Sequence, residues 1–452
     1  MKSLLSLVAA LAVAVAPAAS SVAATPKVCA ECVRANMAHL ASAEMRGRSC
    51  GTADENAAAR FVADQLKAAR ARGAGEGGAY LQPVEFRLPT YAAPPTLEVG
   101  GQRMVQGGEI LTLEPAPLAE GPLVVVGLAD PAAAAGRVAV YDAPYDPKAV
   151  DTFFRAGAVA VIVPAPESVV KLWVQLAERG PGGVEVMGAE TPGARPPPRT
   201  VVFARPETMV ALHGLEGQAA RVAAPRGAPG VRTTYNVLGV IHGTAPDADT
   251  QAVLLTAHYD HVGVRGGVVY PGANDDASGT AAVLEFARIL GAGKAPKRTV
   301  QFALFGCEEE GGHGAKYFLA HPSTPLTDLV ANLEFEMIGV PDPADRKALM
   351  LTGWERSTLG PALKAHGASI HPDAYPQENF FQRSDNYQLA RKGVVAQTIS
   401  AWPIPPTYHQ PSDDLAHVDL PFMAEVVQSL VGPIGWLLNS DFRPEWNPGM
   451  KP

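Results

Sequence analysis

The chain has 452 residues, which is enough for two or three domains with a sizeable buried core. Hydrophobic residues make up 47% of it and charged residues 18%, a composition typical of a globular protein. The formal net charge is −8 and no dense run of Lys or Arg occurs, so the composition argues against a nucleic-acid partner.

The first 24 residues have the pattern of a secretory signal peptide. Lys2 supplies a positive charge, residues 4–15 form an apolar stretch, and Val22-Ala23-Ala24 offers small residues for cleavage near Ala24. The stretch is shorter than the roughly 18 residues that a membrane-spanning helix needs, and a retained anchor is the alternative. We therefore expect a secreted or periplasmic protein with no membrane contact after signal removal.

Four cysteines occur in the sequence, and export would permit disulfides between them. Cys29 and Cys32 form a CxxC pair, Cys50 follows, and Cys307 stands far along the chain beside acidic residues. We expect one bridge, from Cys50 to Cys29 or Cys32. A redox-active CxxC is the weaker alternative because no thioredoxin-like βαβ pattern surrounds it, and a zinc ribbon would need a second CxxC.

Residues 25–105 are expected to form the N-terminal part of the main domain. Val62, Leu66 and Ala69 recur at helical spacing, and short apolar runs broken by prolines follow at residues 83–99, as in strands near a sheet edge.

Residues 106–226 differ in amino-acid composition and pattern from the chain on either side. Short β-branched runs such as LVVVGLA and GRVAVYDA alternate there with Pro, Gly and Asp, and few acid or base clusters occur. We predict a separate β-rich module, inserted into the main domain.

Residues 227–452 have the pattern of an α/β domain. Apolar runs predict five strands, at residues 236–243, 251–257, 299–305, 331–339 and 393–400. Val283, Phe286 and Leu290 share one face of a helix between the second and third runs. Strands that alternate with helices predict an α/β fold with a mostly parallel central sheet covered on both faces.

Histidines and carboxylates stand where two of these strands end. His258 and Asp260 follow the second strand, and Glu308 and Glu309 follow the third. Asp275 precedes a helix, where a carboxylate on its own would indicate only a helix cap. Imidazole and carboxylate are good zinc ligands, and ligands bind beyond the carboxyl ends of parallel strands. Together these residues predict a metal site.

The motifs HYD, PGANDDASG, EE after a strand, EMIG and YHQPSDD occur in this order between residues 258 and 414. Together they resemble the M28 family of zinc peptidases. The resemblance covers about residues 32–105 and 228–440, and residues 106–226 are similar, more weakly, to a protease-associated (PA) insert. It implies a zinc exopeptidase-like three-layer fold, two zinc ions and a peptide substrate.

The resemblance also implies roles for single residues. His258 would bind the first zinc ion, and Asp275 would bridge the two, with a cis peptide bond after it. Glu309 and His409 would bind the second ion.

Two further residues would act in catalysis without binding metal. Glu308 would be the general base that takes a proton from the water between the two ions. Asp260 would be the partner that orients His258.

The remaining metal ligand departs from the family pattern. Relatives usually have Asp in a strand motif resembling NxDMxG, whereas this chain reads Asn332-Leu-Glu-Phe-Glu-Met-Ile-Gly339. Alignment on Met-Ile-Gly selects Glu336, and alignment on the Asn selects Glu334. We expect Glu336. Many relatives also have His where this chain has Asn386, which cannot take a proton at neutral pH.

The resemblance predicts an exported di-zinc exopeptidase, and more specifically an aminopeptidase. A carboxypeptidase of the glutamate-releasing type is one alternative, for which Arg383 is the candidate to bind a substrate carboxylate. A glutaminyl-cyclase-like transferase with a single zinc ion is another. The sequence leaves the preferred substrate residue and the oligomeric state open.

Overall fold

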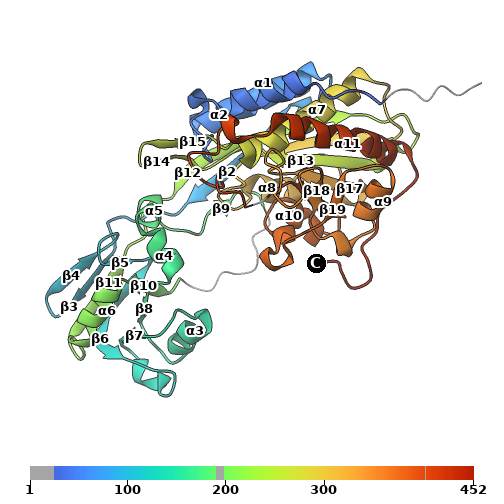
Figure 1. The fold of residues 1–452 in the computed structure, drawn as a ribbon. Coiled ribbons are helices and arrows are strands. Elements are labelled where there is room, and N and C mark those ends of the chain that lie inside the picture. Colours follow the sequence, from blue (N-terminus) through green and yellow to red (C-terminus); the bar gives the residue numbers. More distant parts are fainter. Residues whose placement is uncertain (1–24, 190–197, 403) are drawn as a thin grey trace, which may run out of the picture.

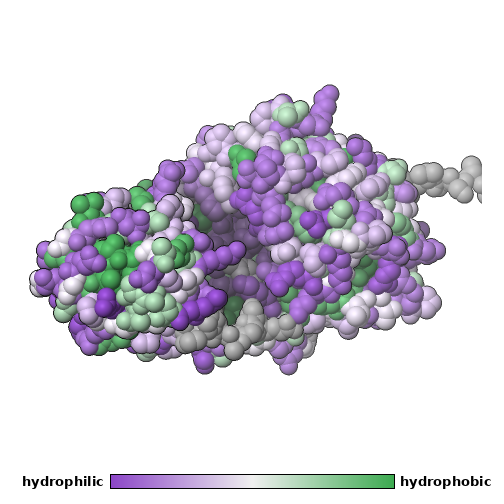
Figure 2. Space-filling model, turned by 90° about the horizontal axis from the view of Figure 1, so that it is seen from below, coloured by the Kyte–Doolittle hydropathy of each residue, from purple (hydrophilic) through white to green (hydrophobic). Residues whose placement is uncertain are grey.

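A computed structural model describes residues 25–189, 198–402 and 404–452. The expected signal peptide, residues 1–24, lies outside the described residues. The chain forms two bodies, a larger one built on a broad sheet and a smaller one between β2 and β12 in the sequence (Figure 1). Seen from below, the surface is hollowed where the two bodies meet (Figure 2).

The larger body is organised around one mixed sheet. Its strands, in spatial order, are β19 (Ile370–Pro372), β18 (Leu349–Leu351), β20 (Ala396–Ser400), β17 (Leu329–Phe335), β13 (Ala252–His258), β16 (Thr299–Phe305), β12 (Gly230–Ile241), β2 (Leu81–Leu88) and β9 (Glu185–Val186), with β1 (Arg72–Gly73) paired to β12. The five strands predicted from the sequence are β12, β13, β16, β17 and β20.

Strand direction changes from the centre of this sheet to its sides. β20, β17, β13 and β16 run parallel to one another, as predicted. β12, β2 and β9 continue the sheet with antiparallel pairings, and β18 is antiparallel to β20. The expectation of a mostly parallel sheet therefore describes the central strands, which carry the site.

Helices cover both faces of the larger sheet, which gives three layers (Figure 1). One face is covered by α1 (Ala30–Leu40), α2 (Ala53–Ala68), α7 (Gly279–Ala292) and α11 (Leu420–Asn439), and the other by α8 (His313–Ala320) and α10 (Asn386–Arg391), while α9 (Leu359–Ala365) packs beside α11. Side chains of β13 alternate between the two layers, because successive strand residues point to opposite faces. Val253 and Leu255 pack on the first face and Leu254 on the second.

Helix α11 is the one helix among the described residues that is long and apolar enough to cross a membrane, by length and composition alone. Half of its most apolar stretch is buried within the fold. Met423, Val427 and Leu430 pack in the main core, which is the environment of a core helix.

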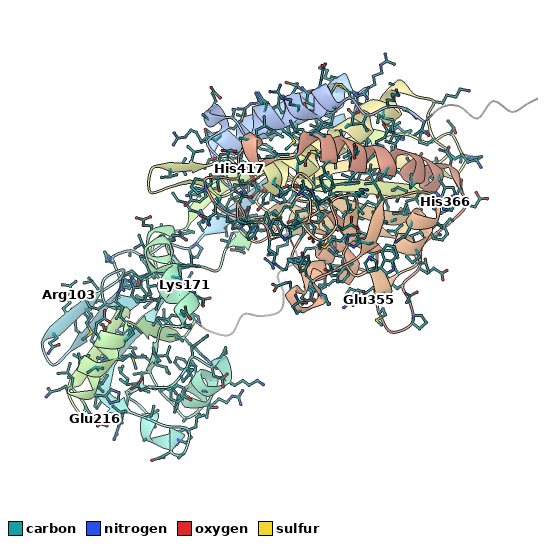
Figure 3. All side chains as sticks on the ribbon, viewed as in Figure 1. Arg103, Lys171, Glu216, Glu355, His366 and His417 are labelled. Carbon is teal, nitrogen blue, oxygen red and sulfur yellow. A yellow bond between two sulfur atoms is a disulfide. The ribbon has the colours of Figure 1, made fainter. Side chains whose placement is uncertain are left out.

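The smaller body has a sheet of its own. Its strands, in spatial order, are β4 (Gln102–Val105), β3 (Thr96–Val99), β11 (Ala219–Ala224), β6 (Ala116–Val125), β7 (Val138–Val140), β8 (Ala160–Pro164), β10 (Thr200–Ala204) and β5 (Ile110–Leu111). Its helices are α3 (Pro147–Arg155), α4 (Glu167–Lys171), α5 (Trp173–Arg179) and α6 (Pro206–His213). The side chains of Arg103, Lys171 and Glu216 lie on this body (Figure 3).

The smaller sheet begins at Thr96 and not at the expected boundary, residue 106. β3 pairs with β11 and β4 pairs with β3, so the chain has already entered the smaller body at these strands. Their short, proline-flanked sequence does not distinguish the two sheets. In addition, β9 lies inside the expected insert but pairs with β2 of the larger sheet.

The expected bridge from Cys50 to Cys29 or Cys32 is wrong. Cys29 pairs with Cys32, and Cys50 pairs with Cys307. The second bridge joins residues 257 positions apart, and only the fold brings them together. Cys50 precedes α2 and Cys307 follows β16, and both pack against Phe86.

Candidate metal centre

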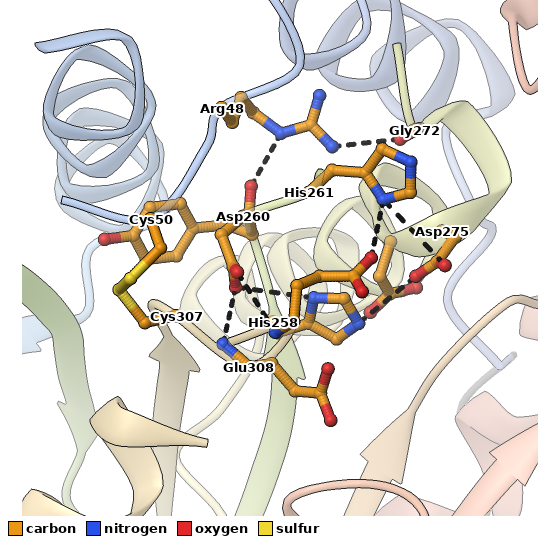
Figure 4. A network of polar contacts seen from close by, with 12 residues as sticks. Arg48, Cys50, His258, Asp260, His261, Gly272, Asp275, Cys307 and Glu308 are labelled. Carbon is orange, nitrogen blue, oxygen red and sulfur yellow. Dashed lines mark hydrogen bonds and ion pairs between the residues drawn. A yellow bond between two sulfur atoms is a disulfide. The ribbon is translucent and has the colours of Figure 1, made fainter. Parts of the chain in front are cut away.

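The expected site residues gather at one edge of the larger sheet. His258 ends β13, Glu308 and Glu309 follow β16, and Glu336 follows β17. Because these strands are parallel and adjacent, their carboxyl ends lie at the same edge. Asp275 approaches from the segment before α7, and Figure 4 shows it beside His258.

One group of possible metal ligands consists of His258, Asp275 and Glu336. His258 Nε2 lies 3.4 Å from Asp275 Oδ1 and 3.9 Å from Glu336 Oε1. Glu334 is used differently, since its carboxylate accepts hydrogen bonds from Ser384 Oγ at 2.9 Å and from the backbone N–H of Asn386. The structure thus brings Glu336, and not Glu334, to His258.

A second group lies on the other side of Asp275. His409 Nε2 is 3.1 Å from Asp275 Oδ2 and 3.1 Å from Glu309 Oε2, so the three residues expected at the second ion do meet. His261 joins them, with its Nδ1 atom 2.8 Å from Glu309 Oε1. We assigned no role to His261 from the sequence, although it stands three positions after His258 in the same HYDH motif.

The segment around Asp275 is fixed by its neighbours. The peptide bond between Asp275 and Asp276 is cis, which confirms what the resemblance implied. The Asp413 carboxylate accepts hydrogen bonds from the backbone N–H groups of Asn274 at 2.8 Å and Asp275 at 3.0 Å. Because both carboxylate oxygens are used, Asp413 holds the turn that presents Asp275.

Asp260 faces His258, as expected, and makes further contacts. Its Oδ1 atom lies 3.6 Å from His258 Nδ1, an ion-pair distance that is longer than a hydrogen bond. Its two oxygens accept hydrogen bonds from the backbone N–H groups of Glu308 at 2.9 Å and Glu309 at 3.2 Å. Asp260 therefore ties the end of β13 to the turn after β16 (Figure 4).

Arg48 organises the loops around the site, and we did not single it out from the sequence. Its guanidinium group is fully buried and donates hydrogen bonds to the carbonyl groups of Leu40, Tyr259, Pro271 and Gly272. These carbonyl groups come from three separate segments. One side chain therefore joins the loop after β13 to the loop that leads to Asp275.

Acidic side chains crowd the site next to Glu336. Burial raises the pKa of Glu308 and of Glu334 well above the usual range, and neighbouring carboxylates add to the effect. Burial also raises the pKa of Glu336 and of Asp385 to about 7. So many carboxylates in a shielded site require positive charge to be stable in the ionised form.

Several donor atoms at the site have no hydrogen-bond partner among the described residues. They include both ring nitrogens of His258 and His261, Nε2 of His409 and Oε1 of Glu309. Buried polar atoms usually have such a partner, so their convergence on shared points fits ligands of metal ions. The two groups share Asp275, as ligands of a closely spaced ion pair would.

A small cavity of about 40 Å³ adjoins Glu336. Its lining includes Met337, Met350, Phe380 and Tyr408, together with the guanidinium-bearing Arg383. Polar side chains, among them Thr352, Thr398 and Ser400, complete the lining, so the cavity beside Glu336 is mixed in character.

Comparison with known proteins agrees with this geometry. Residues 236–431 match the model of Peptidase family M28. An aminopeptidase of Bacillus subtilis, YwaD, is 32% identical over 128 residues, 28% of this chain and 24% of that protein. A vacuolar membrane protease of Schizophyllum commune is 38% identical over 99 residues, 22% of this chain and 10% of that protein. Both matches therefore span less than two thirds of the relative.

Solved structures share the fold over most of the chain. An aminopeptidase from Aneurinibacillus sp. strain AM-1 superposes with a TM-score of 0.62, covers 92% of this chain and 96% of its own, and is 22% identical. A zinc aminopeptidase from Bacillus subtilis gives a TM-score of 0.58 at 19% identity, over 92% and 97% of the two chains. The solved structures share the fold of this chain, and residues 236–431 match Peptidase family M28.

Proposed function

We propose that the protein is a di-zinc exopeptidase that acts as an aminopeptidase. The observation that carries this proposal is the pair of ligand groups that share Asp275, with Glu308 beside them. The first ion would be held by His258, Asp275 and Glu336, and the second by Asp275, Glu309 and His409.

The zinc ions, when bound, would polarise the peptide carbonyl and lower the pKa of a water molecule. Glu308 would take the proton from that water. Its backbone N–H is held by Asp260, while its side chain is free of the two ligand groups. The acid formed at Glu308 can then give the proton to the leaving amine.

The charge of the site favours a substrate with a free amino terminus. Glu336 lines the small cavity, and its charge contributes, after burial, to the raised pKa of Glu334 and of Asp385 nearby. A positive α-amino group is attracted by this arrangement, and a substrate carboxylate is repelled.

Arg383 does not offset this preference. Its guanidinium group lies 3.8 Å from Glu378 Oε2 and over the ring of Phe380. Among the described residues that line the cavity it is the one basic side chain, and Glu378 is its acidic neighbour. This arrangement supports an aminopeptidase over a carboxypeptidase that binds a terminal carboxylate.

The test compares matched peptides in the presence of zinc. We expect cleavage of peptides with a free amino terminus and a blocked carboxyl terminus. We expect no cleavage of peptides with a blocked amino terminus and a free carboxyl terminus. Cleavage of the latter peptides alone would establish the carboxypeptidase. Formation of a cyclised amino terminus, with one zinc per chain, would establish the transferase.

We also propose that the chain is exported and that the smaller body is a PA-like module that limits access to the site. The signal-like segment supports export, and the hollow between the two bodies supports limited access (Figure 2). Fractionation of cells that express the full chain tests the first point. If the second is right, long or folded substrates are cleaved more slowly than tripeptides.

A further inference from the structure

We propose that His261 is an additional protein ligand of the second zinc ion, beyond Asp275, Glu309 and His409. This inference rests on the proposed function and gives the two ions unequal ligand sets. The second ion would have two imidazoles and two carboxylates, whereas the first would have one imidazole and two carboxylates.

The position of His261 supports direct binding. Its side chain is fully enclosed, and Nδ1 lies 2.8 Å from Glu309 Oε1 and 3.8 Å from Asp275 Oδ2. Zinc ligands at about 2.0–2.1 Å in a tetrahedral site stand about 3.3 Å from one another. The distances around His261 bracket this value, and those around His258, 3.4 and 3.9 Å, lie slightly above it.

The orientation of the ring separates metal binding from a simple hydrogen bond. His261 Nδ1 and Glu309 Oε1 are close, but neither atom has a hydrogen-bond partner among the described residues. Together with a carboxylate oxygen of Asp275, these atoms lie within 4.8 Å of one another, which is close enough to share one metal ion. His409 Nε2, next to Glu309 Oε2, likewise has no hydrogen-bond partner among the described residues.

Two imidazoles thus flank a single carboxylate. The rings of His261 and His409 meet edge to face at 5.5 Å, and Glu309 presents one oxygen to each. Figure 4 shows the His261 ring turned toward the acidic residues of the site.

The surrounding fold makes room for this ring. Gly272 has φ +62°, and a Cβ atom at that position would lie 2.4 Å from His261 Cγ. The Gly272 carbonyl is held by Arg48 at 2.9 Å, and the backbone N–H of His261 donates to the carbonyl of Arg48 at 3.3 Å. The loop therefore fixes the ring where it is.

Unequal ligand sets predict ordered loss of zinc. The second ion, with more imidazole ligands, should resist a chelator longer than the first. We expect graded dipicolinate to remove one zinc per chain before the other from the full chain.

Two variants distinguish a ligand from a residue that only orients Glu309. His261→Ala removes the ring, and His261→Asn keeps an N–H donor near the place of Nδ1. If His261 binds zinc, both variants lose more than about 10²-fold in affinity for the second ion, which exceeds the roughly 10–100-fold typical of an outer hydrogen-bond partner. His242→Asn, on an exposed ring, is the matched control.

X-ray absorption on the zinc-loaded chain gives a readout that needs no variant. If His261 binds zinc, the spectrum should show three imidazole ligands for the two zinc ions, and two after His261→Asn. Two imidazoles in the unmodified chain, or wild-type zinc affinity in His261→Asn, would overturn this role of His261. Failure to bind a second zinc ion at all, with His409→Ala also without effect, would instead overturn the proposed function.

Discussion

The Glu55 carboxylate accepts a hydrogen bond from the backbone N–H of Cys307 at 3.0 Å. Glu55 lies in the first turn of α2, far from Glu308 in the sequence, and Cys307 directly precedes Glu308. The same carboxylate also accepts hydrogen bonds from Thr234 Oγ1 at 2.7 Å and from the backbone N–H of Gly51 at 2.6 Å. Glu55 therefore joins three segments behind the proposed base.

Replacement of Glu55 tests this connection. Glu55→Ala leaves buried donors of Cys307, Thr234 and Gly51 without an acceptor, which costs about 1–3 kcal/mol for each buried group. We expect a lower free energy of unfolding in urea and a lower kcat. Glu31→Ala, in the exposed first turn of α1, is the matched control. Equal stability of the two variants would contradict the role of Glu55.

Replacement of Glu308 separates proton transfer from metal binding. Glu308→Gln keeps the size of the side chain and the backbone contact with Asp260 but cannot accept the proton. We expect kcat on an aminoacyl p-nitroanilide to fall about 10²–10⁴-fold with zinc content unchanged. The control Glu355→Gln alters an exposed acid of the larger body (Figure 3). Near-normal turnover of Glu308→Gln would contradict the role of Glu308 as the general base.

Glu334 and Glu336 should respond differently to removal of the carboxylate. Glu336→Ala should lose zinc from the first site, because Glu336 faces His258. Glu334→Ala should mainly lower the free energy of unfolding, because Ser384 and the backbone of Asn386 lose their acceptor. Zinc titration and urea unfolding of both variants measure the two effects. Loss of zinc from Glu334→Ala but not from Glu336→Ala would mean that Glu334, which the alignment on Asn332 selects, is the metal ligand.

Two glycines provide a matched pair for the loop beside His261. Gly272 and Gly266 both have positive φ, so an Ala at either position meets similar backbone strain of about 1–2 kcal/mol. A Cβ at Gly272 would meet His261 and Asp275, whereas a Cβ at Gly266 has no atom within 4 Å. Isothermal titration should therefore show weaker zinc binding in Gly272→Ala only. Equal affinities would argue against the packing described here.

The two disulfides should differ in their effect on stability. In the chain-entropy description, a bridge that closes a long loop restricts the unfolded chain more than one that closes a short loop. The Cys50–Cys307 bridge spans 257 residues and the Cys29–Cys32 bridge spans 3. Replacing the first pair by Ser should cost about 2–5 kcal/mol. Replacing the second pair is the control, and urea unfolding should show a smaller loss.

Local patterns predicted the strands and the residues at their ends. Apolar runs that stop at His258 and Glu308 mark strands β13 and β16, because a buried strand and its polar end are adjacent in the sequence. The family motifs predicted that Asp275 and His409 lie close together, and the distance of 3.1 Å between Asp275 Oδ2 and His409 Nε2 agrees with this.

Contacts between distant segments could not be predicted in this way. Neither the pairing of Cys50 nor the carbonyl partners of Arg48 leaves a local pattern. Asp260 lies beside His258 as the resemblance implied, but its hydrogen bonds to the turn after β16 could not be predicted from the sequence. Glu55 did leave a signal, since Thr52 and Glu55 have the T-x-x-E spacing of a helix start.

The pairing of β9 with β2 gives the connection between the two bodies a definite width. At this point Phe86 and Arg87 pair with Val186 and Glu185 on one side, while Arg87 and Leu88 pair with β12 on the other. The connection between the two bodies is therefore three strands wide at this point. The smaller body therefore leaves the larger sheet on hydrogen-bonded strands and not on a single extended linker.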